Sequence, residues 1–83
     1  MRQHYEYRVC QIQQSRVTYV NGTWQGKLPP ASDKVEAALA SCAQTWDYLH
    51  SAGEDGWELV GAVAPGSGSA DVHQVLYLKR DKG

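Results

Sequence analysis

The amino-terminal segment alternates between two kinds of residue, a pattern typical of a β-strand. From His4 to Ile12, every second side chain falls on the same face. One face is apolar, with Tyr5, Tyr7 and Val9, and the other is mixed, with Glu6, Arg8, Cys10 and Ile12. We expect the apolar face of this strand to be covered by a helix.

Asn21-Gly22 marks a tight turn in the next segment. Both residues readily adopt positive φ angles, which a type I′ hairpin turn requires. The dipeptide separates two short β-prone runs and predicts a hairpin over residues 17–25, in which Tyr19 faces Trp24. Pro29-Pro30 then ends the extended region, because proline has no N–H to donate to a neighbouring strand.

A helical pattern follows the two prolines. Asp33 or Ser32 can cap its first turn, and Gly53 is placed to end it. Between these limits, apolar residues recur at steps of three and four, which predicts one helix of about five turns. The stripe consists of Val35, Ala38, Leu39, Cys42, Trp46 and Leu49.

Two further strands are expected, from Trp57 to Ala64 and from Val72 to Arg80, joined by the loop Pro65 to Asp71. The first of them follows the stretch AGEDGWELVGAV, in which we expect Trp57 and Leu59 to pack under the helix near Trp46 and Leu49. The chain is therefore predicted to be a single α+β domain over residues 1–83. It would hold an antiparallel sheet of four to five strands with one helix on one face, in the order strand, strand, strand, helix, strand, strand.

One helix cannot cover both faces of such a sheet. The faces assigned to the helix are Tyr5/Tyr7/Val9, Trp57/Leu59/Val63 and Leu76/Leu78. A second apolar face remains, which the hairpin, a partner subunit or a ligand could cover. Its predicted members are Cys10, Ile12, Val60, Ala62, Val75 and Tyr77.

The length and the net charge of the chain limit the classes of partner that it is expected to bind. A chain of 83 residues with 42% hydrophobic content buries only about 60–65% of its unfolded surface, so its stability is modest and self-association is plausible. A net charge of −1 argues against a nucleic-acid partner, because the only basic cluster, Lys79-Arg80 and Lys82, has Asp81 inside it and is expected to be a solvated carboxyl end. No apolar run approaches the roughly 18 residues of a membrane span, and the amino end has no secretory signal pattern. We therefore expect a cytoplasmic protein without a membrane partner, in which Cys10 and Cys42 are free buried thiols.

Three short motifs occur in a recognisable order: YEYRV at residues 5–9, GWELV at 56–60 and LYLKR at 76–80. Together they resemble the bacterial family of small proteins catalogued as domain of unknown function 4177, over about half of the chain. The resemblance implies a strand, a helix that ends near a Gly-rich turn, and two closing strands. Residues 14–30 would be a hairpin insertion relative to the simple family pattern. Because the family carries no established activity, the resemblance implies a fold rather than a function.

Catalytic chemistry is weakly represented. His4, His50 and His73 have no ligand-like spacing to a Cys or a carboxylate, so neither a metal nor a cofactor is expected. Glu54, Asp55 and Glu58 are close in sequence, but they read as solvated turn charges. No nucleophile motif accompanies them, and we do not expect an enzyme.

Three functions remain, and the first two are favoured over the third, which is an enzyme. The first is a non-enzymatic assembly domain that self-associates through its second sheet face or its hairpin. The second is a small-ligand binder, for example a nucleotide-sequestering protein, with its site at a subunit junction. Its predicted ligand-binding residues are Arg8, Trp24, His73, Tyr77 and Lys79.

Overall fold

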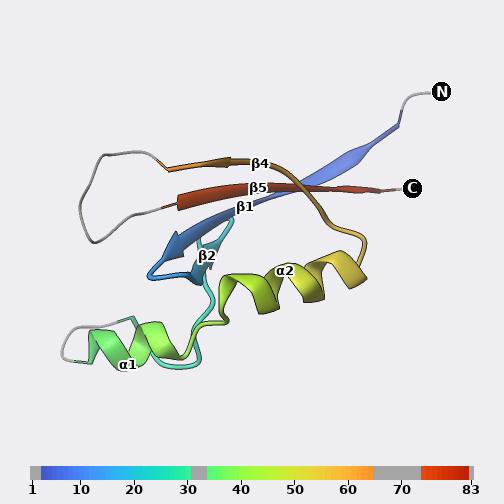
Figure 1. Ribbon diagram of the computed structural model, residues 1–83. Helices are drawn as coiled ribbons and strands as arrows, with labels where there is room; N and C mark the ends of the chain where they lie inside the picture. The colour runs from blue at the N-terminus through green and yellow to red at the C-terminus, as the bar shows by residue number, and fades with distance from the viewer. Residues whose placement is uncertain (1–2, 31–33, 65–73, 83) are drawn as a thin grey trace.

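The computed structural model describes residues 3–30, 34–64 and 74–82. The elements in chain order are β1 Tyr5–Gln13, β2 Arg16–Val20, β3 Thr23–Trp24, α1 Val35–Ala40, α2 Thr45–Glu54, β4 Glu58–Val63 and β5 Gln74–Asp81. The strands form one antiparallel sheet in the order β3-β2-β1-β5-β4, with both helices on the same side of it (Figure 1). This arrangement confirms the predicted α+β fold with one main helix, α2, packed against the sheet.

The β2–β3 hairpin forms as the sequence predicts. Asn21 and Gly22 have φ angles of 51° and 82°, so both occupy the left-handed region that a type I′ turn requires. Tyr19 pairs with Trp24, and their rings lie 5.4 Å apart in an edge-to-face arrangement. The Trp24 indole also donates a hydrogen bond of 2.7 Å to the Leu28 carbonyl, which holds the chain beyond the hairpin close to β3.

A second tight turn joins β1 to β2 and was not predicted. Gln14 and Ser15 have φ angles of 51° and 61°, although neither is a glycine or an asparagine. The turn is stabilised from outside, because the backbone N–H of Thr45, at the start of α2, donates to the Ser15 carbonyl over 2.9 Å. A helix N-terminus has free N–H donors, and here the turn supplies an acceptor for one of them.

The prediction of one continuous helix is wrong. α1 ends at Ala40 and α2 begins at Thr45, and the segment between them bonds to β2 instead of continuing the helix. Arg16 donates to the carbonyls of Ala40 and Cys42, at 3.1 and 2.7 Å, and the Val17 N–H donates to the Ala43 carbonyl at 2.9 Å. Contacts with a distant strand therefore satisfy carbonyls that a continuous helix would have bonded internally. The predicted caps Ser32 and Asp33 lie outside the described residues.

The predicted helix stop at Gly53 is also wrong, because Gly53 lies inside α2. The helix ends in a Schellman motif around Gly56, whose φ is 92°. The N–H of Gly56 bonds to the Gly53 carbonyl at 3.0 Å, and the N–H of Trp57 bonds to the Ala52 carbonyl at 2.9 Å. The accompanying apolar contact is between Trp57 and Ala52, which both belong to the core.

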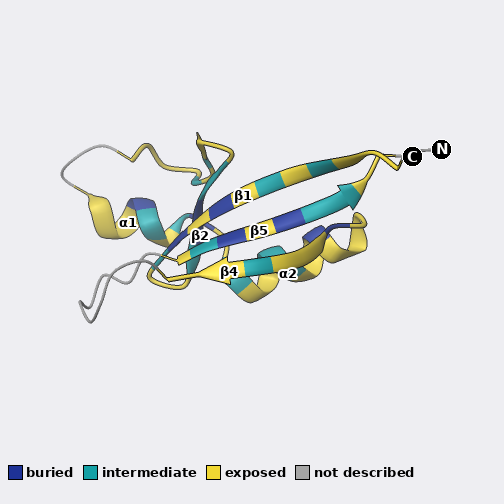
Figure 2. Cartoon of the chain, turned by 90° about the horizontal axis from the view of Figure 1, so that it is seen from above, coloured by how far each residue is buried: buried dark blue, intermediate teal, exposed yellow. Residues whose placement is uncertain are grey.

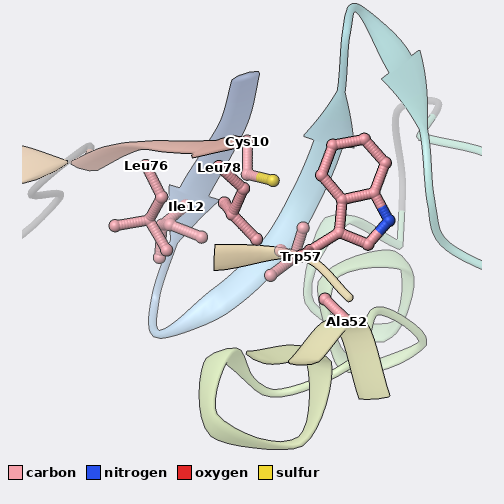
Figure 3. Close-up of a cluster of buried hydrophobic side chains, with 7 residues drawn as sticks. Cys10, Ile12, Ala52, Trp57, Leu76 and Leu78 are labelled. Carbon is pink, nitrogen blue, oxygen red and sulfur yellow. The ribbon is translucent and has the colours of Figure 1, made fainter. Parts of the chain in front are cut away.

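The core lies between the sheet and α2 (Figure 3). It is formed by Cys10, Ile12, Val17, Ala52, Trp57, Leu76 and Leu78, with Val20, Tyr48 and Leu49 packed against it. The assignment of faces in β1 was thus reversed: Cys10 and Ile12 are 0% and 2% exposed, whereas Tyr7 is 60% exposed. Of the two strand residues expected under the helix, Trp57 is in the core and Leu59 is exposed. Of the two helix residues expected near them, Leu49 packs against the core and Trp46 is exposed.

Within the described ranges, no helix is long and apolar enough to cross a membrane.

Candidate functional site

None of the described elements packs over the side of the sheet away from the helices (Figures 1 and 2). Several large apolar side chains on that side are exposed. Residues directly opposite one another in an antiparallel sheet share a face. Val9 stands opposite Tyr77, and Gln11 stands between Tyr19 and Val75. We call this surface the open face and define it by six residues: Tyr5, Tyr7, Val9, Val63, Val75 and Tyr77.

Five of these six side chains are 36–60% exposed, and Val75 is half-buried. They come from β1, β5 and β4, which are adjacent in the sheet, so they form a continuous patch. The Tyr77 ring lies over Gly61 on β4, because a Cβ at that glycine would be 3.8 Å from the ring. The centre of the open face is therefore aromatic and uncharged.

Charges gather at one end of the open face. The Lys79 ammonium lies 4.7 Å from the centre of the Tyr5 ring and 3.8 Å from a Glu58 carboxylate oxygen. An open pocket of about 300 Å³ lies here, lined by Tyr5, Gly56, Glu58, Lys79, Arg80 and Asp81. Its cationic and anionic side chains are equal in number, and its lysine is already paired, so the pocket does not select strongly for a ligand of either sign.

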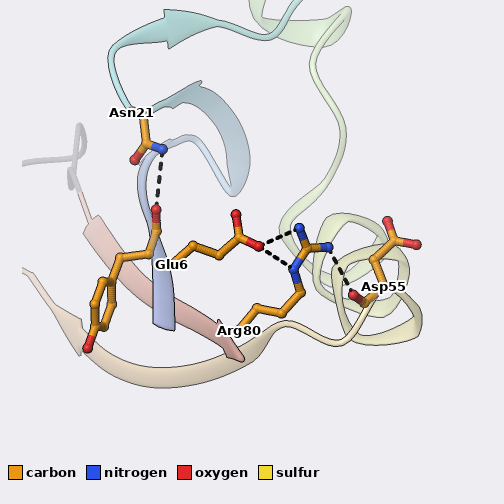
Figure 4. Close-up of polar contacts among 5 residues, drawn as sticks. Glu6, Asn21, Asp55 and Arg80 are labelled. Atoms are coloured by element: carbon orange, nitrogen blue, oxygen red, sulfur yellow. Dashed lines mark hydrogen bonds and ion pairs between the residues drawn. The ribbon is translucent and has the colours of Figure 1, made fainter. Parts of the chain in front are cut away.

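On the helix side of the sheet, Arg80 joins three elements (Figure 4). Its guanidinium donates to one Glu6 carboxylate oxygen at 2.9 and 2.7 Å and to the Asp55 carbonyl at 3.1 Å. It also lies 4.5 Å from the centre of the Trp57 ring. A cation beside the last carbonyls of a helix is favourable, so Arg80 fixes the end of α2 to β1 and β5.

Arg8 has a similar structural position. Its guanidinium lies 4.2 Å from the Trp57 ring centre and donates to the Tyr48 hydroxyl at 2.8 Å. Two arginines thus contact one indole, which is 7% exposed. The indole N–H has no hydrogen-bond partner among the described residues.

The buried thiol of Cys10 adjoins Tyr48. Burial raises the pKa of Cys10 above its ordinary value, and the Tyr48 hydrogen bond and the Arg8 charge only partly oppose this. Burial likewise raises the pKa of Tyr48. Both groups are held in their neutral forms, so neither is an activated nucleophile or base at neutral pH.

The predicted ligand-binding residues do not converge. Arg8 lies on the helix side of the sheet, and Trp24 lies on β3 with its indole N–H bonded to Leu28. Tyr77 and Lys79 share the open side of β5, two residues apart. His73 lies outside the described residues. Among the members of this set that the structure describes, it therefore brings together only Tyr77 and Lys79.

The predicted interface residues are also divided. Val75 and Tyr77 belong to the open face, and Cys10 and Ile12 are in the core. Ala62 stands opposite Leu76 and so lies on the helix side of the edge strand β4. Val60 lies at a register shift between Leu59 and Gly61, and its side chain is 49% exposed.

Sequence reasoning missed Tyr5, Tyr7 and Val9 as open-face residues. Their apolar character pointed to the core, and the charges of Glu6 and Arg8 pointed the other way. A usable signal was present in the partner strand: Leu76 and Leu78 need a core position, and Arg80 continues their face. An arginine there supplies the partner that lets Glu6 lie on the same side as the core.

Comparisons with protein-family models, with curated proteins and with solved structures found no match. The resemblance to domain of unknown function 4177 therefore stays a prediction. In the parts of the chain that the structure describes, no cluster of three or more His, Cys, Asp or Glu could hold a metal ion.

Proposed function

We propose that this protein is a small non-enzymatic assembly domain that self-associates through its open face. The observation that carries the proposal is the continuous, largely exposed patch of Tyr5, Tyr7, Val9, Val63, Val75 and Tyr77 across three adjacent strands. Exposed apolar patches of this kind mark interaction surfaces, because leaving them in water forfeits the free energy of burial.

The dimensions of the chain favour a second copy as the partner. Its accessible surface is 5898 Å², whereas a monomeric protein of 9.2 kDa is expected to expose about 4900 Å². The difference, about 1000 Å², is comparable to the roughly 800 Å² that each partner buries in a standard interface. The radius of gyration is 14.0 Å, against about 12 Å for a compact chain of this length. These two departures from the expected values support the proposal that the chain is a subunit of an assembly.

The charge pattern fits two open faces packed against each other. Charged residues are confined to one end, where Lys79 and Glu58 neutralise each other, and the central row holds Val9, Tyr77 and Gly61. Two copies related by a two-fold axis would bury the uncharged centre and leave the charged ends at the rim. Tyrosine suits such an interface, since its ring is apolar and its hydroxyl can bond at the edge.

The alternative, a small-ligand binder, depends on the pocket beside Tyr5 and Lys79. Its volume of about 300 Å³ is at the lower limit for a small-molecule site. The residues first expected to bind a ligand are divided between two faces of the sheet, so the assembly function is the better supported of the two.

The test introduces a charge into the open face. Tyr7 is 60% exposed and stands opposite Lys79, so Tyr7→Glu adds a carboxylate with little cost to the folded chain. In an interface between two open faces, the same carboxylate would be desolvated, which costs several kcal/mol. We expect Tyr7→Glu to lower the mass in solution, measured by native mass spectrometry and sedimentation over a wide range of protein concentrations.

Val35→Glu is the matched control, because Val35 is an equally accessible apolar residue on α1, 51% exposed and away from the open face. It should keep the wild-type mass. A wild-type protein that is monomeric at all concentrations would refute the proposal. A small molecule retained in the native spectrum, and lost on Lys79→Ala, would favour the ligand-binding alternative instead.

A further inference from the structure

The second exposed feature of the sheet is its edge. Apart from the start of β2, which bonds to residues 43–44, the main free edges among the described residues are β3, the Tyr5–Val9 half of β1, and β4. A free strand edge presents backbone N–H and C=O groups that pair readily with another chain, and proteins normally protect such edges.

Two of these edges are protected. β3 has only two residues, Thr23 and Trp24. The free half of β1 is met by the Asn21 side chain, which accepts from the Val9 N–H at 2.8 Å. The Asn21 amide also donates to the Tyr7 carbonyl at 3.4 Å, and Figure 4 shows this contact. Short length is a recognised way of blocking an edge, and the Asn21 side chain occupies backbone groups that a pairing strand would use.

The edge of β4 lacks comparable protection. From Leu59 to Ala64 it carries no charge and no proline. Leu59, Val60 and Val63 are 46%, 49% and 49% exposed, so the strand is apolar toward both sides of the sheet. Its irregularity is confined to the register shift between Leu59 and Gly61, and from Gly61 to Val63 it pairs regularly with β5.

The direction of the backbone groups on β4 follows from the ladder. The Lys82 N–H donates to the His4 carbonyl at 2.8 Å, which places the even-numbered residues of β5 in hydrogen-bonded pairs with β1. Ala62 stands opposite Leu76, an even-numbered residue. The backbone N–H and C=O of Ala62 therefore point away from β5, in the plane of the sheet and beyond its edge.

We propose that β4 pairs antiparallel with β4 of a second copy across a two-fold axis near Ala62, so that two sheets join edge to edge. A second copy fits this edge because the stretch from Leu59 to Ala64 is uncharged, so antiparallel pairing centred near Ala62 opposes no like charges within it, and the same backbone groups bond in both directions. Edge pairing would also place a neighbouring strand beside Leu59 and Val60, which are 46% and 49% exposed.

This inference rests on the proposed function and deepens it, because edge pairing and packing of the open faces use different surfaces. Edge pairing joins two chains into one continuous sheet, and packing of two such sheets through their open faces gives a tetramer. Its failure can be distinguished from failure of the open-face proposal. Ala62→Pro removes the outward N–H and leaves the open face intact, and proline is tolerated at an edge where the N–H faces solvent. Ala62→Ser keeps the N–H and is the matched control.

The experiment measures the mass of wild type, Ala62→Pro, Ala62→Ser and Tyr7→Glu by native mass spectrometry, with far-UV circular dichroism as the check of folding. We expect Ala62→Pro to halve the mass of the wild-type assembly and Ala62→Ser to leave it unchanged. Equal masses for the wild type and a folded Ala62→Pro overturn edge pairing. A loss of mass in Tyr7→Glu alone assigns the assembly to the open face only, and a loss in Ala62→Pro alone refutes the open face and keeps the edge.

A second measurement serves if the proline variant does not fold. In the wild type, the backbone amide of Ala62 should exchange with deuterium more slowly as the protein concentration rises, because pairing protects it. The amide of Glu36, exposed in the first turn of α1, serves as the internal reference. An Ala62 exchange rate that does not change while the protein assembles would overturn the inference.

Discussion

Replacing Trp57 tests how the helix is held on the sheet. The indole is 7% exposed and belongs to the core with Ala52, Leu76 and Leu78. A tryptophan buries roughly 200 Å², worth about 5 kcal/mol at 25 cal/mol per Å² as an upper bound. The unpaired indole N–H offsets about 1–3 kcal/mol of this. The contacts with the two arginines add about 0.5–1 kcal/mol each.

We therefore expect Trp57→Ala to lower the free energy of unfolding by about 3–5 kcal/mol, in the range usual for the loss of a large buried side chain. Trp57→Phe is the matched variant, since it keeps a ring between the helix and the sheet and removes the unpaired N–H. It should cost less than about 1.5 kcal/mol.

Urea unfolding followed by far-UV circular dichroism is the assay, because tryptophan fluorescence would change with the substitution itself. It should be run at two protein concentrations, since any assembly of the wild type adds to its apparent stability. A Trp57→Ala variant that is folded and destabilised by less than about 1 kcal/mol would refute the reasoning. Equal costs for Ala and Phe would contradict the role assigned to the ring between the helix and the sheet.

Three further substitutions and one titration follow from the same contacts. Ser15→Gly should raise the free energy of unfolding by up to about 1 kcal/mol in urea titrations, because Ser15 has a φ of 61°, which glycine adopts without steric cost; a loss of stability would contradict this. Gly26→Ala should lower the melting temperature, at a cost of about 1–3 kcal/mol, since its Cβ would lie 2.6 Å from the nearest side-chain atom. Gly53→Ala should instead raise the melting temperature, because Gly53 lies inside α2, where alanine has the higher helix propensity, and nothing lies within 4 Å of the added Cβ. Burial raises the pKa of Cys10 above 9.0, so above that pH the unfolded chain binds fewer protons than the folded one. The urea concentration at the midpoint of unfolding should therefore decrease as the pH rises from about 8 to about 10, and it should decrease less steeply in Cys10→Ala. A wild-type midpoint that increases over this range would show that the sign is wrong.

Local chemistry made several elements predictable from sequence. Asn21-Gly22 determines the β2–β3 turn, because few other dipeptides accept two positive φ angles. This turn also sets the register of the hairpin, in which Tyr19 pairs with Trp24. The helical periodicity after the prolines identified the helical region, and Trp57 was correctly expected beneath it.

What the sequence alone could not decide was which alternating face becomes the core. Both faces of β1 carry apolar residues, and Glu6 and Arg8 argued for an exposed position. In the folded chain, Arg80 pairs with Glu6, and the Trp57 ring and the Tyr48 hydroxyl accommodate Arg8. Charges on the core side are therefore satisfied by residues distant in sequence.

The same principle explains the interrupted helix and the candidate interface. Residues 41–44 have a helical pattern, but Arg16 and Val17 of β2 bind their carbonyls and draw them out of the helix. The sequence by itself determined the strands, the helical region and the Asn21-Gly22 turn, because propensity and periodicity act between residues a few positions apart. Only the tertiary structure decided that Tyr5, Tyr7 and Val9 face outward and that β4 is a free edge, because both depend on which strands pair and on which side α2 packs.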